Sequence, residues 1–321
     1  MGRQRKLLLA VRIVVSAAML AVLFTRFDLH DLQALLPRRQ LSSWSWIVAG
    51  LTVSLGAVLL ATLRWQRVLQ AIGLPTDLQP LLSHNLAGQF VSNFLPTTVG
   101  GDVLRVTRLS AGNGRPPESF ASVVLERLTG FVVLPFITLV ALIGNPSLLH
   151  MGTATRLALA LSLGTLAVLV VILVVAGNAR LGARLTGHHA KWLSFVSAVH
   201  LGLDQIRRQP AQAAKVLVTA LAYQLTIVLA AWAAAHALGL HVGWSAAMAF
   251  VPVVAICQVL PLSVSGLGLR EGALVLLLAP LGVAAAQAVA LGLLLYAMNL
   301  VVSLLGAPAF AVGTRPLRAM V

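Results

Sequence analysis

The feature that most constrains this chain is a series of apolar runs, each about as long as a helix that crosses a lipid bilayer. A helical crossing needs about 20 predominantly apolar residues. Only 10% of the 321 residues are charged, against about 25% in soluble domains. The sequence therefore predicts an all-α, polytopic membrane protein that forms one integral membrane domain over residues 1–321. The six predicted crossings are 7–25, 44–63, 119–143, 155–176, 213–237 and 283–310.

The distribution of basic residues predicts which side of the membrane each loop occupies. The chain has 23 Lys and Arg against 8 Asp and Glu. Because cytoplasmic loops are enriched in Lys and Arg, both termini are predicted to be cytoplasmic, in a bacterial inner membrane. The predicted cytoplasmic segments contain Arg3, Arg5, Lys6, Arg64, Arg67, Arg108, Arg115, Arg180, Arg184, Lys191, Arg207, Arg208, Lys215, Arg315 and Arg318. The predicted outer loops contain Arg26, Arg38, Arg39 and Arg156.

Two stretches do not fit a simple crossing. In the first, over residues 80–110, the apolar leg 81–95 is only about 22 Å long at 1.5 Å per residue, short of a hydrocarbon core of about 30 Å. It is interrupted at Pro96 and again at Gly100 and Gly101. We expect a re-entrant hairpin, in which a helix goes part of the way into the membrane, turns and comes back.

The second stretch, over residues 244–280, repeats the first. Residues 95–105 align without a gap with residues 260–270, and both segments read L-P-x-[ST]-V-x-G-x-x-L-R. Asn93 matches Gln258 two positions before the shared leucine. Three predicted crossings separate the copies, so the second hairpin enters from the opposite face. Inverted repeats of broken helices surround a binding site near the midplane in many transporters, and we expect a polar cavity at the centre.

Three acidic residues lie in or beside the apolar segments, and each has an arginine close to it in sequence. A charge at the bilayer centre costs at least about 2.5 kcal/mol and therefore needs a partner. We expect these acids either to form structural ion pairs that hold the hairpins, or to position the arginines of a binding site or bind a cationic part of a lipid head group. The acids are Asp102, Glu126 and Glu271, and the arginines are Arg105, Arg108, Arg127 and Arg270.

Arg105 and Arg270 occupy the same position in the two copies. If the hairpins meet, both guanidinium groups can bind one phosphate, since this planar group forms bidentate bonds with phosphate oxygens. The glycines of the two motifs would let the backbone approach the ligand; they are Gly100, Gly101, Gly266 and Gly268.

A polar stripe follows the first hairpin helix, where Asn85, Gln89 and Asn93 recur every four residues. Such a stripe faces protein or water and not lipid, so it either lines the transport path or joins helices by hydrogen bonds. Tyr296 and Asn299 are three residues apart on the last crossing and can face the same cavity.

The motif residues resemble those of one family, the lysylphosphatidylglycerol synthase transmembrane domain family, whose members are also described as flippase-like. The resemblance implies a polytopic fold with two re-entrant hairpins and movement of lipids between leaflets. The sequence ends at Val321 without the aminoacyl-transferring domain of the namesake proteins, so lysine transfer is not implied. The residues are Asn93, Pro96, Gly100, Gly101, Asp102, Arg105, Glu126, Arg127, Pro261, Ser263, Gly266, Gly268, Arg270 and Glu271.

We therefore expect a stand-alone flippase or transporter for an anionic phospholipid or lipid-linked intermediate, with no enzymatic activity, cofactor, metal or nucleic-acid partner. No nucleotide or metalloprotease motif occurs in the sequence. Two alternatives stay open: a membrane-embedded enzyme that acts on lipid phosphates, and an accessory scaffold for a lipid-modifying enzyme. The predicted substrate-binding residues are Arg105, Arg270, Asp102, Glu126, Glu271, Arg127, Asn93, Gln258, Gly100, Gly101, Gly266 and Gly268.

Overall fold

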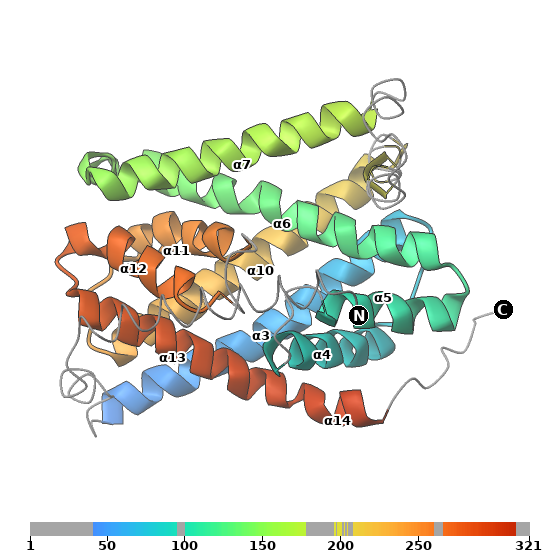
Figure 1. Ribbon diagram of the computed structural model, residues 1–321, viewed down its shortest axis with the longest axis horizontal. Helices are drawn as coiled ribbons and strands as arrows, with labels where there is room; N and C mark the ends of the chain where they lie inside the picture. Colours follow the sequence, from blue (N-terminus) through green and yellow to red (C-terminus); the bar gives the residue numbers. More distant parts are fainter. Residues whose placement is uncertain are drawn as a thin grey trace, which may run out of the picture.

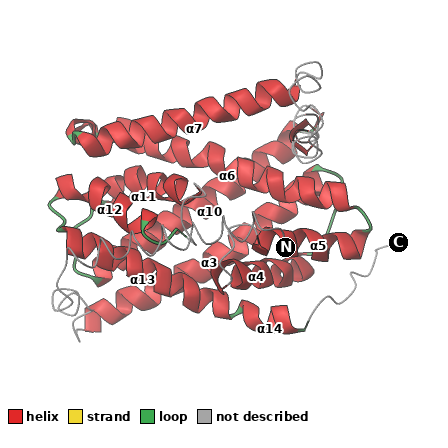
Figure 2. Cartoon of the chain, viewed as in Figure 1, coloured by secondary structure: helices red, strands yellow, loops and turns green. Residues whose placement is uncertain are grey.

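The computed structural model describes residues 41–94, 100–177, 208–259 and 266–312, with isolated positions between 196 and 204. Within these residues every regular element is a helix, and no strand occurs (Figure 2). The predicted crossing at 7–25 and the two hairpin turns lie outside the described residues.

Five of the described helices are long and apolar enough to cross a membrane. They confirm the polytopic all-α fold and overlap the five predicted crossings that the structure describes. Their bounds are α3 (Leu41–Ala71), α6 (Pro116–Gly144), α7 (Thr153–Gly177), α10 (Pro210–Ala237) and α13 (Ala285–Leu304).

Four shorter helices fall in the two stretches that share the repeated motif. They are α4 (Leu78–Phe94), α5 (Gly100–Asn113), α11 (Trp244–Val259) and α12 (Leu269–Leu278). Helix α4 packs on α5, and α11 packs on α12. Figure 1 shows the two pairs toward opposite ends of the long helices. The remaining short elements are η1 (Pro146–His150), η2 (Ala279–Leu281) and α14 (Gly306–Ala311).

Helices α3 and α10 form the most extensive contact in the bundle. They run antiparallel, because Trp46 near the start of α3 makes an edge-to-face contact with Trp232 near the end of α10, with ring centroids 5.5 Å apart. Farther along α3, the Arg64 guanidinium lies over the Tyr223 ring. The buried face of α10 is rich in alanine, and such small side chains allow membrane helices to approach closely.

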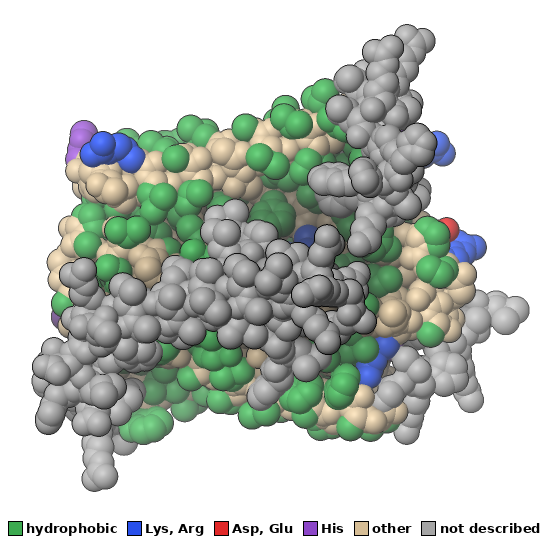
Figure 3. Space-filling model, in the orientation of Figure 1, with side chains coloured by type: hydrophobic (Ala, Val, Ile, Leu, Met, Phe, Trp, Pro, Cys, Tyr) green, Lys and Arg blue, Asp and Glu red, His purple; other side chains and the backbone are tan. Residues whose placement is uncertain are grey.

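Much of the described outer surface is hydrophobic (Figure 3). Ile143, Val171 and Val218 are each more than half exposed, at 76%, 61% and 65%. Large apolar side chains on the outside of long helices are what a lipid solvent requires, since lipid tails, unlike water, do not penalise their exposure.

The last predicted crossing, 283–310, is divided in the structure. Helix α13 ends at Leu304, and α14 begins at Gly306 and packs on α4. A side chain at position 306 would collide with the Leu86 carbonyl group. The chain therefore bends where glycine lets α14 approach the α4 backbone, a contact that hydropathy does not reveal.

Candidate functional site

The centre of the described charge network is Glu126 on α6. Its Oε1 accepts a hydrogen bond from Arg64 Nη2 of α3 at 2.6 Å, and its Oε2 accepts one from Arg105 Nη2 of α5. All three residues are buried. Each guanidinium group also lies over an aromatic ring. The Arg105 Cζ lies 4.1 Å from the centroid of the Trp65 ring, and the Arg64 Cζ lies 4.6 Å from the centroid of the Tyr223 ring.

A second carboxylate extends this network. Asp102, in the first turn of α5, forms an ion pair with Arg127, in which Asp102 Oδ2 lies 2.5 Å from Arg127 Nη2. The other carboxylate oxygen of Asp102 lies 3.6 Å from Arg105 Nη1. Glu126 and Arg127 are adjacent in sequence but do not pair with each other. Consecutive helical residues point about 100° apart because a turn takes 3.6 residues. The two side chains therefore meet partners on different helices.

Two arginines that were assigned to cytoplasmic segments are buried inside the bundle. Helix α3 continues eight residues past the predicted end of its crossing at position 63, to Ala71, so Arg64 belongs to the helix and is only 7% exposed. Arg108 is 6% exposed and donates hydrogen bonds to the carbonyl oxygens of Ala309 at 2.8 Å and Phe310 at 3.1 Å. Arg108 thus joins α5 to the C-terminal end of α14, where free helix carbonyls need donors.

In the second motif copy, Arg270 pairs with its neighbour Glu271, as the sequence predicted. Arg270 Nη2 lies 2.6 Å from Glu271 Oε1. The other carboxylate oxygen accepts a 2.7 Å hydrogen bond from the Gly268 N–H. The guanidinium carbon of Arg270 lies 5.2 Å from the centroid of the Tyr296 ring on α13. Glu271 therefore both balances the arginine and holds the start of α12.

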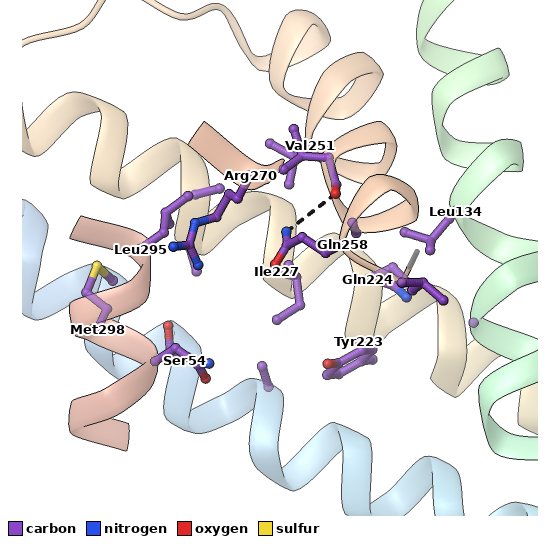
Figure 4. A pocket seen from close by; sticks show the side chains of 18 of the residues that line it. Ser54, Leu134, Tyr223, Gln224, Ile227, Val251, Gln258, Arg270, Leu295 and Met298 are labelled. Atoms are coloured by element: carbon purple, nitrogen blue, oxygen red, sulfur yellow. Dashed lines mark hydrogen bonds between the residues drawn. The ribbon is translucent and has the colours of Figure 1, made fainter. Parts of the chain in front are cut away.

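A cavity of about 410 Å³ lies between these two charge clusters (Figure 4). Its wall is mostly apolar and is formed by α3, α4, α6, α10, α11, α12 and α13. Figure 4 shows Gln224 of α10, Gln258 of α11 and Arg270 of α12 around this space. The charged and amide side chains in the lining are Arg64, Gln89, Arg127, Gln224, Gln258, Arg270 and Asn299.

The structure places three of the predicted site residues in the cavity wall: Arg127, Gln258 and Arg270. Arg105 is absent from the described lining and is held against Trp65 and Glu126 instead. The two motif arginines therefore do not line this cavity together. Arg105 reaches it only indirectly, through the carboxylate that it shares with Arg64.

The motif glycines have different structural roles. A side chain at Gly101 would collide with Ser92 and with the backbone of Gly88 on α4. Gly266 and Gly268 adopt φ values of 76° and 84°, a left-handed conformation that favours glycine. Gly100 is the first residue of α5.

The polar stripe on α4 divides into the two roles that the sequence left open. Asn85 is buried and donates a 3.0 Å hydrogen bond to Thr62 Oγ1 on α3. Gln89 lines the cavity, and Asn93 accepts a 3.1 Å hydrogen bond from Asn299, which also lines it. One end of the stripe therefore joins helices, and the remainder lies in or beside the cavity.

Sequence reasoning missed Arg64, Gln224 and Gly130 as cavity residues. Arg64 carried a usable signal, because an arginine one residue past a predicted crossing belongs to the same helix whenever that helix extends. Gln224 was also detectable as an amide in the middle of the apolar run 213–237, since buried polar side chains are expensive in lipid. Gly130 had no distinguishing signal among the chain's 26 glycines.

The fold and the cavity define a multi-pass helical membrane protein whose bundle encloses a mostly apolar cavity bordered by several charged and amide side chains. Comparison with known families identifies the chain further. The family model described as "Lysylphosphatidylglycerol synthase TM region" matches residues 9–306, and the protein belongs to this family. The match confirms the resemblance inferred from the motifs and indicates a lipid-related function in the membrane. No curated protein matches the sequence.

Proposed function

We propose that this protein moves an anionic phospholipid or lipid-linked intermediate between membrane leaflets, with the head group passing through the cavity and the acyl chains remaining in lipid. One observation carries the proposal. The cavity wall includes the guanidinium groups of Arg64, Arg127 and Arg270, and none of its described residues carries a carboxylate. An anionic head group entering this space meets positive charge from three different helices.

The charge balance of the larger cluster supports an anionic ligand. Arg64, Arg105 and Arg127 contribute three positive charges, Asp102 and Glu126 two negative ones, and the difference is one net positive charge. Each of these arginines has a carboxylate partner, and the Arg127 side chain is 48% exposed. A phosphate-bearing head group in the cavity can balance the remaining positive charge.

The two helix pairs provide a route for alternating access. We propose that α4–α5 and α11–α12 are re-entrant hairpins related as an inverted repeat. The shared motif supports this relation, as do three features of the fold: the pairs lie toward opposite ends of the bundle, each packs against itself, and α6, α7 and α10 separate them in sequence. Rocking of one repeat against the other then exposes the cavity to each leaflet in turn.

The proposal places the protein in a bacterial inner membrane, with both termini in the cytoplasm, and assigns it no covalent chemistry. Lipid recovered after transport is expected to have the same mass as lipid supplied. A new product in mass spectra of the recovered lipid would instead support the enzyme alternative.

Leaflet exchange in liposomes tests the proposal. The purified protein is reconstituted with acyl-labelled phosphatidylglycerol or phosphatidylcholine, and exchange is followed by chemical quenching of the label in the outer leaflet. We expect the protein to accelerate exchange of phosphatidylglycerol more than that of phosphatidylcholine. Exchange equal to that of protein-free vesicles, for a panel of anionic lipids, would contradict the proposal.

Matched arginine variants make this test specific. Arg270→Gln is expected to slow exchange about tenfold or more, because a hydrogen bond to a charged group contributes about 1.5–3 kcal/mol. Arg105→Gln is measured in parallel. Arg156→Gln is the control, because Arg156 is exposed at the start of α7 and is not a cavity residue. An equal loss in the Arg156→Gln variant would show that the effect is not one of the cavity.

A further inference from the structure

Two hydrogen-bond donors that have no partner among the described residues lie close to one position beside Gly130 on α6. A Cβ atom built on Gly130 would lie 3.4 Å from Arg64 Nη1 and 3.5 Å from Gln224 Nε2. Apart from the chain neighbours of Gly130 and the adjacent backbone of α6, no other atom of the described residues lies within 4 Å of that position. The two donors come from α3 and α10, and the absence of a side chain at Gly130 leaves the space between them open to the cavity.

Gln224 has no partner for its amide among the described residues, although it is only 8% exposed. It lies in the cavity wall, one residue from the Tyr223 ring on which Arg64 stacks. The amide atoms are not among the fully enclosed atoms that lack a partner, so they keep some exposed surface at the cavity wall. A ligand in the cavity can therefore form hydrogen bonds with this amide.

Arg64 is held in one orientation, but not all of its hydrogen-bond donors have a partner among the described residues. Its Nη2 is bound to Glu126 at 2.6 Å, and Glu126 is shared with Arg105. One carboxylate therefore serves two guanidinium groups, and Arg64 Nη1 has no hydrogen-bond partner in the described part of the chain. The Glu126 bond and the Tyr223 ring fix this group, so Nη1 is held in place before a ligand arrives.

We infer that the space over Gly130 is an oxyanion subsite, in which Arg64 and Gln224 bind a phosphoryl oxygen of the lipid head group. This assignment rests on the proposed function and names where its phosphate is held. A phosphoryl oxygen in this space lies beyond the Cβ position, because a non-bonded oxygen cannot approach the Gly130 Cα to a covalent distance, and each hydrogen bond to it needs a donor–acceptor distance of about 2.9 Å. Arg127, one turn before Gly130 on α6, adds positive charge at the same wall.

Gly130→Ala is the sharpest test, because the new methyl group occupies the space between the donors without removing any of them. Its contacts at 3.4 and 3.5 Å are ordinary packing distances, and alanine favours a helix more than glycine does. Gly56→Ala is the matched control, since Gly56 lies on α3 with Arg64 and has no atom within 4 Å of its Cβ position. Helix content and melting temperature of both variants verify folding.

Binding is measured on the purified full chain by calorimetry, with dihexanoylphosphatidylglycerol and inorganic phosphate as separate probes. We expect Gly130→Ala to raise the Kd for both probes about tenfold or more, the effect of losing a hydrogen bond to a charged group. Gln224→Glu is expected to do the same, because it replaces a donor with a repelling carboxylate. Gly56→Ala is expected to bind like the wild type.

The possible outcomes distinguish a failure of the subsite assignment from a failure of the proposed function. Unchanged lipid binding in both Gly130→Ala and Gln224→Glu overturns the subsite and leaves transport open. A loss confined to inorganic phosphate assigns the site to a free anion and overturns its assignment to a lipid. Lipid binding that depends on Gly130, in a wild-type protein that exchanges no lipid in vesicles, supports the subsite and refutes the proposed function.

Discussion

The two copies of the repeated motif use the same arginine in different ways. Arg105 in the first copy pairs with Glu126 on a different helix and shares it with Arg64. Arg270 in the second copy pairs with the adjacent Glu271 and lies in the cavity wall. The first arginine therefore joins three helices, whereas the second is balanced locally and presents its guanidinium group to the cavity.

The difference follows from the residues beside each arginine. The position that holds Glu271 in the second copy holds Val106 in the first, so Arg105 has no adjacent carboxylate and must find one on α6. The aligned glycines differ in the same manner. Gly101 allows α5 to approach α4, whereas Gly266 takes a left-handed backbone conformation with φ of 76°. Two segments of one chain that share a sequence motif thus do not necessarily make the same contacts.

The largest difference between the two copies is expected at their carboxylates. Glu126→Gln leaves Arg64 buried without a negative partner and Arg105 with only Asp102, at 3.6 Å, and breaking a buried ion pair costs about 3–5 kcal/mol. We expect the free energy of unfolding, measured in detergent by denaturant titration, to fall by about this amount. An unchanged unfolding midpoint would show that the network joining α3, α5 and α6 does not stabilise the fold.

Glu271→Gln is expected to have a smaller effect, about 2–3 kcal/mol. The change leaves only one guanidinium group without its charge partner, and that group borders the cavity. The glutamine oxygen still accepts the hydrogen bond from Gly268. The same titration measures the effect, and a loss larger than that of Glu126→Gln would reverse the proposed contrast between the copies.

Gly101→Ala tests the packing role of the first glycine. The added methyl group collides with Ser92 and with the Gly88 backbone, and overpacking of this kind costs about 2 kcal/mol. We expect lower melting temperature and faster hydrogen exchange in α4 and α5, whose contact is directly affected. Exchange that increases equally in α11 and α12 would indicate a global effect and not a local one.

Gly266→Ala is expected to have the smallest effect, about 1 kcal/mol from the left-handed conformation. The new methyl group would lie 2.9 Å from Gln258 Cγ and 3.0 Å from its Oε1, and this flexible side chain can move aside. The melting temperature measures the change. A loss equal to that of Gly101→Ala would mean that both glycines are required for close packing.

The sequence was sufficient for the features that depend on local pattern. Apolar runs near 20 residues predict crossings wherever lipid is the solvent, and five of them are long helices in the structure. The motif residues predicted the family that the chain belongs to. The pairing of Arg270 with Glu271 was also predicted, and it forms within the first turn of α12 without a contribution from another helix.

Only the tertiary structure decided which side chains surround the cavity. Glu126 takes its partners from α3 and α5, and Gln224 and Gly130 meet Arg64 only because α6 and α10 pack beside α3. These contacts depend on the rotation of each helix about its axis, which hydropathy does not predict. An apolar run gives the length of a crossing but not the direction in which its few polar groups point. The charges of this protein were visible in its sequence, while their partners depended on how the helices pack.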